Sequence, residues 1–169
     1  MRNLDYNIIK EYFGNLVENH VEIKSFIGYS SEELAMNLAK VKGIESPMLV
    51  LFDYQGKLDG NNQRTFASRT ISFAVLQQVN KLDDFTKQYE AVASCESLGL
   101  SFLSRIYYDS KLSKLKWLYN NFVKDSVRFN EVRYKSGNGL FGMEFTFNLK
   151  THEPLSVNPS VWKDIDQIC

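Results

Sequence analysis

The N-terminal quarter of the chain is patterned like two amphipathic helices. Between Asp5 and about His20, apolar residues recur at helical intervals, which predicts one buried face; they are Ile8, Ile9, Tyr12, Phe13, Leu16 and Val17. Ser30 stands three residues before Glu33, the spacing of an N-terminal capping box. Apolar residues then follow at helical intervals until Gly43. The sequence therefore predicts a helix over 5–20 and a shorter one over 31–41.

Two strand patterns follow, separated by a polar stretch. Pro47 precedes a run from Met48 to Tyr54 that is apolar except for Asp53, which is typical of a central strand covered on both faces. From Ala67 to Val75 apolar and polar residues alternate, as in a strand with one buried face. The stretch from Gln55 to Arg64 contains two glycines and an Asn-Asn pair, and it predicts a turn or an exposed loop. We therefore expect two long antiparallel strands whose hairpin projects from the body of the protein.

One long helix is predicted next. Asp83 or Asp84 can cap a helix that runs to about Tyr108. Its expected buried face is marked by a helical repeat of Phe85, Tyr89, Val92, Glu96, Gly99, Leu103 and Ile106. Most of these residues are apolar, so we interpret the repeat as the face that meets the core.

The C-terminal half of the domain has the alternating pattern that predicts strands. Alternation predicts a short strand over Leu115–Tyr119 and another over Val127–Tyr134, with a bulge near Asn130-Glu131. Ser136-Gly137-Asn138-Gly139 predicts a hairpin turn, because Asn and Gly tolerate positive φ. The strand that follows has the clearest alternation in the chain, with one face formed by Phe141, Met143, Phe145, Phe147 and Leu149.

Beyond Lys150 the periodic patterns stop. The segment from Thr151 to Trp162 holds two of the three prolines, which favour extended chain. It also carries apolar residues that require a surface to pack against, namely Leu155, Val157, Val161 and Trp162. The sequence therefore predicts a single α+β domain over 1–150, with helices mainly on one face of an antiparallel sheet, and an extended C-terminal arm over 151–169.

Composition and charge narrow the function classes. The chain has 169 residues, of which 44% are hydrophobic, and no apolar run approaches the roughly 20 residues that cross a bilayer. The N-terminus lacks the apolar core of a secretory signal, so we expect a cytosolic product with no membrane partner. Twenty basic and twenty acidic residues give a net charge of zero, which argues against a nucleic-acid binder. One basic cluster is interpreted as a solvated face: Lys111, Lys114, Lys116, Lys124 and Arg128.

The chain offers few groups for catalysis or metal binding. His20 and His152 are the only histidines, and Cys95 and Cys169 are far apart, so neither a zinc site nor a disulfide framework is expected. Asp83-Asp84 fits helix capping. There is no Gly-x-Ser-x-Gly elbow and no phosphate-binding glycine loop. We therefore predict no catalytic residue, no metal and no cofactor, and we interpret Asp53 as a residue at a strand end.

The order of four segments along the chain can be compared with that of known proteins. These segments are Ser46–Leu51, Arg69–Val75, the helix around Tyr89 to Ile106, and Gly142–Phe147. In this order the chain resembles the tail-terminator proteins of long-tailed bacteriophages and the related neck proteins. The resemblance implies a subunit of a ring, commonly a hexamer, that sits where the tail tube meets the head and has neither catalysis nor a cofactor. The predicted helix over 31–41 and the arm depart from the simplest members.

Our first hypothesis is a non-enzymatic virion protein made in the host bacterial cytoplasm, a tail terminator or neck ring subunit that joins the head connector to the tail. Its expected partners are copies of itself in a ring, a hexamer being favoured, and neighbouring neck or tail-tube proteins. DNA would pass through the lumen without sequence-specific contact. The expected oligomer interface consists of Gln55, Lys57, Asp59, Asn61, Arg64, Arg69, Leu155, Val157, Val161 and Trp162.

Two other classes stay open. A small cytosolic enzyme could use carboxylates that converge near Asp53, with Glu90 and Glu96 from the long helix, and it would require a deep pocket. A nucleic-acid-contacting module could use the basic cluster from Lys111 to Arg128 together with the interleaved aromatic residues, and its binding would depend on salt.

Overall fold

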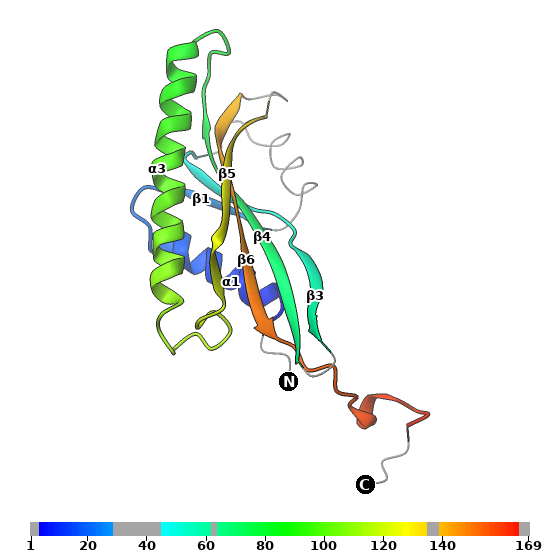
Figure 1. Ribbon diagram of the computed structural model, residues 1–169. Coiled ribbons are helices and arrows are strands. Elements are labelled where there is room, and N and C mark those ends of the chain that lie inside the picture. The colour runs from blue at the N-terminus through cyan, green and yellow to red at the C-terminus, as the bar shows by residue number, and fades with distance from the viewer. Residues whose placement is uncertain (1–3, 29–44, 62–63, 135–138, 166–169) are drawn as a thin grey trace.

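The computed structural model describes residues 4–28, 45–61, 64–134 and 139–165, and within them a six-stranded sheet carries two helices (Figure 1). The helices are α1 (Tyr6–Glu18) and α3 (Phe85–Asp109). The strands are β1 (Ser25–Ile27), β2 (Met48–Leu51), β3 (Gln55–Asn61), β4 (Arg64–Gln78), β5 (Phe122–Tyr134) and β6 (Leu140–His152), and a short 3-10 helix, η1, covers Pro159–Val161. The helix predicted over 31–41, most of the turn predicted at 136–139, and Cys169 lie outside the described residues.

The predicted α+β fold with helices packed against a sheet is confirmed, although the sheet is mixed. Its strand order is β1-β2-β4-β6-β5, and β3 pairs with β4 beside this path. The short β1 lies parallel to β2, whereas the other pairings are antiparallel. The centre of the sheet is the pair β4 and β6, whose register runs from Phe66 opposite His152 to Gln78 opposite Leu140. β4 therefore serves as the common partner of β2, β3 and β6.

The turn or loop predicted over Gln55–Arg64 is wrong for most of its length, because residues 55–61 form β3. All seven residues of this strand are exposed, and they pair with Arg64–Thr70 of β4. A strand exposed on both faces shows no alternation of apolar and polar residues, so only its pairing partner reveals it. Together β3 and the first half of β4 form the projecting hairpin (Figure 1).

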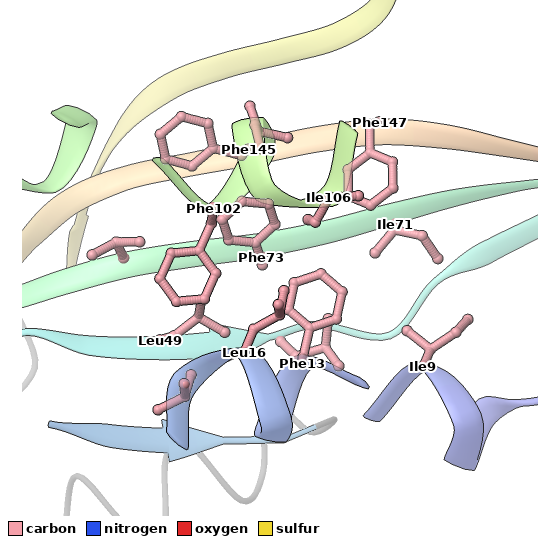
Figure 2. Close-up of a cluster of buried hydrophobic side chains, with 14 of the residues drawn as sticks. Ile9, Phe13, Leu16, Leu49, Ile71, Phe73, Phe102, Ile106, Phe145 and Phe147 are labelled. Atoms are coloured by element: carbon pink, nitrogen blue, oxygen red, sulfur yellow. The ribbon is translucent and has the colours of Figure 1, made fainter. Parts of the chain in front are cut away.

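Both described helices cover the same face of the sheet. Asp5 caps α1 by accepting a hydrogen bond from the Ile8 amide at 3.0 Å, and Asp84 caps α3 by accepting one from the Lys87 amide at 3.1 Å. Figure 2 shows Phe13 of α1 and Phe102 of α3 converging on Phe73 of β4. Their ring centroids lie 5.5 Å and 6.4 Å from that of Phe73. One aromatic core thus joins the two helices to the sheet.

The opposite face of the sheet carries a second, smaller cluster. Successive residues of a strand point to opposite faces, so Leu49 and Leu51 of β2 enter the core under the helices, whereas Met48 and Val50 enter the second cluster. Its other buried members are Ile27, Ala74, Leu76 and Leu140. The prediction that β2 is covered on both faces is therefore confirmed, although the strand ends at Leu51.

Three details of the second half differ from the sequence predictions. Residues 115–119 form turns rather than a strand, with the Leu118 and Tyr119 amides bonded to the Leu115 carbonyl at 2.9 Å and 2.8 Å. The bulge of β5 lies between Val123 and Arg128, where the Ser126 hydroxyl accepts a hydrogen bond from the Asn148 amide. β6 extends two residues past Lys150, so the arm leaves the sheet at residue 153.

Candidate functional site

The projecting hairpin and the base of the C-terminal arm meet at one end of the molecule. The last residues of β6, Thr151 and His152, pair with Ala67 and Phe66 of β4. The first residue beyond the sheet, Glu153, donates its backbone amide to the Thr65 carbonyl at 3.0 Å. The hairpin and the arm, which the sequence suggested as two parts of one interface, are therefore adjacent at this point.

The largely buried side chain of Arg69, on the hairpin, contacts the base of the arm. Its Nη1 donates to the Thr151 hydroxyl at 2.8 Å, and its Nη2 lies 3.7 Å from a Glu153 carboxylate oxygen. The Arg69 side chain is only 12% exposed. We predicted Arg69 as part of the oligomer interface; in the single chain its guanidinium contacts Thr151 and Glu153. Lys150 adds an outer contact, 3.8 Å from the Asp59 carboxylate.

Beyond its base, the arm extends away from the body (Figure 1). Four of its apolar residues expose between 58% and 71% of their surface, namely Leu155, Val157, Val161 and Trp162. The η1 turn orders this part of the arm, because the Asn158 side chain accepts hydrogen bonds from the Ser160 amide at 3.2 Å and its hydroxyl at 2.8 Å. A hollow of about 910 Å³ separates the arm from Trp117 and Asn121 of the body.

The remaining predicted interface residues lie on the hairpin. Gln55, Lys57, Asp59 and Asn61 are exposed on β3, and Arg64 is exposed at the start of β4. Among the described residues, no strand pairs with the outer edge of β3. The hairpin is therefore a polar, solvent-facing ribbon next to the apolar arm.

A second exposed apolar surface lies on α3 and was missed by the sequence analysis. Phe85 and Tyr89 were assigned to the core-facing repeat, yet they are 62% and 66% exposed. In the first half of α3 the buried positions are instead Gln88, Ala91 and Cys95, whereas Gly99, Leu103 and Ile106 of the predicted repeat are buried. Gln88 can be buried because its Nε2 donates to the Leu82 carbonyl at 2.8 Å. Because Gln88 is polar, the sequence pattern did not indicate that its side of α3 packs on the sheet.

The structure does not bring Asp53 and Glu90 together. Asp53 accepts a hydrogen bond from the Tyr6 hydroxyl, next to the point where the Phe52 amide bonds to the Ser72 carbonyl. Glu90 lies with Val79 at the other end of β4. Seven residue steps along the strand lead from Ser72 to Val79, which corresponds to about 23 Å. Among the described residues, no group of three or more His, Cys, Asp or Glu could hold a metal ion.

One partly buried polar cluster joins α1 to the end of α3. The Tyr12 hydroxyl donates to Asp109 Oδ2 at 2.9 Å, and Arg105 Nε lies 3.0 Å from both oxygens of the same carboxylate. Burial, followed by the hydrogen bond to Asp109, raises the pKa of Tyr12 far above its usual range. A phenol that stays protonated at neutral pH does not serve as a base, so we interpret the cluster as a structural clamp.

The other candidate catalytic groups also have structural surroundings. His20 Nδ1 accepts hydrogen bonds from the Glu22 and Ile23 amides, and its ring stacks on Phe102. His152 packs edge-on against Phe66 at the hairpin. Cys95 is fully buried, and desolvation raises the pKa of its thiol to about 12, which suppresses the reactive thiolate.

The basic cluster gathers at the end of α3. The Lys111 and Lys124 ammonium groups lie 4.7 Å and 5.7 Å from the centroid of the Tyr107 ring. Between Arg105 and Arg128 the sequence contains six basic and two acidic residues, in a chain whose net charge is zero. This end of the molecule is therefore locally positive.

Comparison with known proteins gives no family assignment. The chain matches no protein-family model, and no curated protein matches it in sequence. Among the described residues, no helix is both long enough and apolar enough to span a bilayer.

Proposed function

We propose that this chain is a non-enzymatic structural subunit that assembles with copies of itself through its C-terminal arm, as a tail terminator or neck ring protein of a phage virion. One observation carries the proposal: the arm contacts the body at Arg69, and four of its apolar residues, Leu155, Val157, Val161 and Trp162, are mostly exposed to solvent. Covering an apolar side chain of this size contributes about 1.5–3 kcal/mol. An arm with this composition is therefore most stable when a neighbouring subunit covers it.

The environment of the reactive groups supports a role without catalysis. Asp53 is bonded to Tyr6, Asp109 to Arg105 and Tyr12, and Cys95 is buried with a raised thiol pKa. The resemblance to tail-terminator and neck proteins supplies the rest of the proposal. It implies a ring, with a hexamer favoured, between the head connector and the tail tube. DNA would pass through its lumen without sequence-specific contact, and no membrane would be involved.

The mass of the assembly in solution tests this proposal. We compare the full chain with a chain that ends after Glu153, which keeps β6 and the contacts of Arg69. Native mass spectrometry should find a closed oligomer for the full chain and a monomer for the shortened one. Trp162→Ser should weaken assembly, whereas Ser156→Ala in the same arm should leave it intact. A full chain that stays monomeric at a few hundred micromolar would show the proposal to be wrong.

The positive end of α3 supports a second candidate function, contact with nucleic acid. Lys111 and Lys124 both lie over the exposed ring of Tyr107, an arrangement that can combine phosphate contacts with base stacking. Binding to a single-stranded oligonucleotide should then weaken steeply as salt rises. It should disappear in the double variant Lys114→Glu, Lys116→Glu but not in Lys57→Glu on the hairpin. Equal binding by the two variants would exclude this function for the basic cluster.

A further inference from the structure

An apolar patch, which we call the α3 flank, consists of the exposed Phe85, Tyr89 and Phe129 and the partly buried Val92. The three helical residues are spaced by four and three positions, so they share one side of α3. Phe129 of β5 is 46% exposed and stacks on Phe145 with ring centroids 5.7 Å apart. Phe145 lies directly below Gly99 of α3, so the strand and the helix meet along this side.

The α3 flank has a charged rim. Glu131 and Arg133 of β5 form an ion pair, and Glu131 raises the pKa of Arg133, with a smaller contribution from Tyr89. Next to Trp162, the arm carries the exposed pair Lys163 and Asp164. Glu96, one turn after Val92 on the same side of α3, also borders the α3 flank. Both surfaces therefore combine an apolar centre with charges of both signs, so opposite-charge pairs can form across their contact.

The arm of the same chain does not reach the end of the α3 flank that Phe85 and Tyr89 form. Tyr89 lies near Arg133, which pairs with Phe141, whereas the arm leaves the sheet after His152. The eleven residue steps from Phe141 to His152 correspond to about 36 Å. The ten residues from Glu153 to Trp162 span at most about 30 Å, because the η1 turn shortens the extended chain, and they point away from the body (Figure 1). A single copy therefore leaves Phe85 and Tyr89 uncovered.

We propose that the α3 flank receives the arm of a neighbouring copy, residues 155–165. The proposal rests on the proposed function, because it names the surface to which the arm binds in the assembly. The contact joins two different surfaces and is therefore heterologous, so each subunit donates one arm and receives another. Repetition of such a contact closes into a ring when the rotation between subunits permits it.

The exposed area matches what a specific interface requires. The aromatic rings of the α3 flank expose roughly 350 Å², taking about 200 Å² for each fully exposed ring. The apolar side chains of the arm expose about the same area, taking roughly 100 Å² for each fully exposed aliphatic side chain. Together they offer about 700 Å² of apolar surface. An interface of about 1,200 Å² with the usual 57% apolar share contains the same amount.

A cross-link between two differently marked copies tests this contact. One copy carries Tyr89→Cys and an affinity tag, the other carries Val161→Cys, and both carry Cys169→Ser, so that the buried Cys95 is the remaining native thiol. Mild oxidation of the mixture should give a disulfide-linked pair of tagged and untagged chains. Ser94→Cys is the matched control, because it is exposed on α3 on the side away from the α3 flank. It should give less than about a tenth of the product.

A second variant measures the energy of the contact without a cross-link. Tyr89→Glu places a charge on the α3 flank and should raise the dissociation constant at least about tenfold. Ser94→Glu should leave the constant unchanged, and an unchanged melting temperature shows that both variants fold. If the full chain assembles but neither the cross-link nor Tyr89→Glu has an effect, the arm binds elsewhere and this inference is wrong while the proposed function stands. If the full chain is monomeric, the proposed function fails and the inference fails with it.

Discussion

Replacing Gly99 with alanine should destabilise the fold, although alanine favours helices more than glycine does. A Cβ atom at position 99 would lie 2.0 Å from Cε2 and 2.1 Å from Cζ of Phe145, whereas ordinary van der Waals contact begins at 3.4 Å. The ring of Phe145 cannot easily yield, because it is stacked between Phe73 at 5.2 Å and Phe129 at 5.7 Å. The helix must then lift from the sheet, which loosens the core beneath it.

The expected size of the effect follows from two opposing contributions. Overpacking a well-packed core costs about 1–3 kcal/mol, and two atoms that overlap by more than 1 Å place this site in the upper half of that range. Alanine contributes about 0.8–1.0 kcal/mol more than glycine to helix stability. We therefore expect Gly99→Ala to lower the free energy of unfolding by about 1–2 kcal/mol.

Urea unfolding followed by the fluorescence of the buried Trp117 measures this change. The midpoint should fall with an unchanged slope. Ser97→Ala, exposed on the same helix, is the control and should be neutral or slightly stabilising. Adding Phe145→Leu should make Gly99→Ala less costly, because the smaller side chain leaves room for the new methyl group. If Gly99→Ala is as stable as the parent chain, the close packing of α3 on Phe145 is refuted.

Three further predictions concern charged and polar groups. Arg69→Met should lower the free energy of unfolding by about 1–2 kcal/mol, because it removes the hydrogen bond to Thr151; urea unfolding should show an effect below about 0.5 kcal/mol for the exposed Arg64→Met. Burial raises the pKa of Tyr12 above its usual 10.0, so above pH 10 the unfolded state loses this proton first and stability falls as pH rises; Tyr12→Phe should make the loss of stability between pH 10 and 11 shallower. Desolvation raises the pKa of Glu144 above its usual 4.5, so its charged form destabilises the fold at neutral pH; Glu144→Gln should therefore stabilise at pH 7 by less than about 1 kcal/mol, and a gain that persists at pH 3 would contradict this cause.

The arm and the α3 flank differ in how far the sequence could predict them. An extended, proline-containing segment with four apolar residues is recognisable without any partner. Leu155, Val157, Val161 and Trp162 are exposed in the single chain, so the expectation that they pack against a surface stays a prediction. The α3 flank is not recognisable, because Phe85 and Tyr89 fit a core-facing repeat equally well. Rotating a helix by one residue about its axis changes which side meets the sheet. The periodicity alone does not determine that rotation when a polar residue such as Gln88 is buried.

The sequence by itself determined the elements whose signals are local. Asp5 and Asp84 mark the starts of the two described helices, and the alternation from Phe141 to Leu149 identifies β6, because capping and side-chain direction depend on near neighbours in the chain. Only the tertiary structure decided that the polar residues of β3 pair with β4, and that Asp53 and Glu90 lie far apart. It also placed Arg69 inside the contact with the arm. Each of these features depends on contacts between residues that are distant in sequence. The sequence around a strand without a buried face, a lone carboxylate or a single arginine does not indicate which distant residue it contacts.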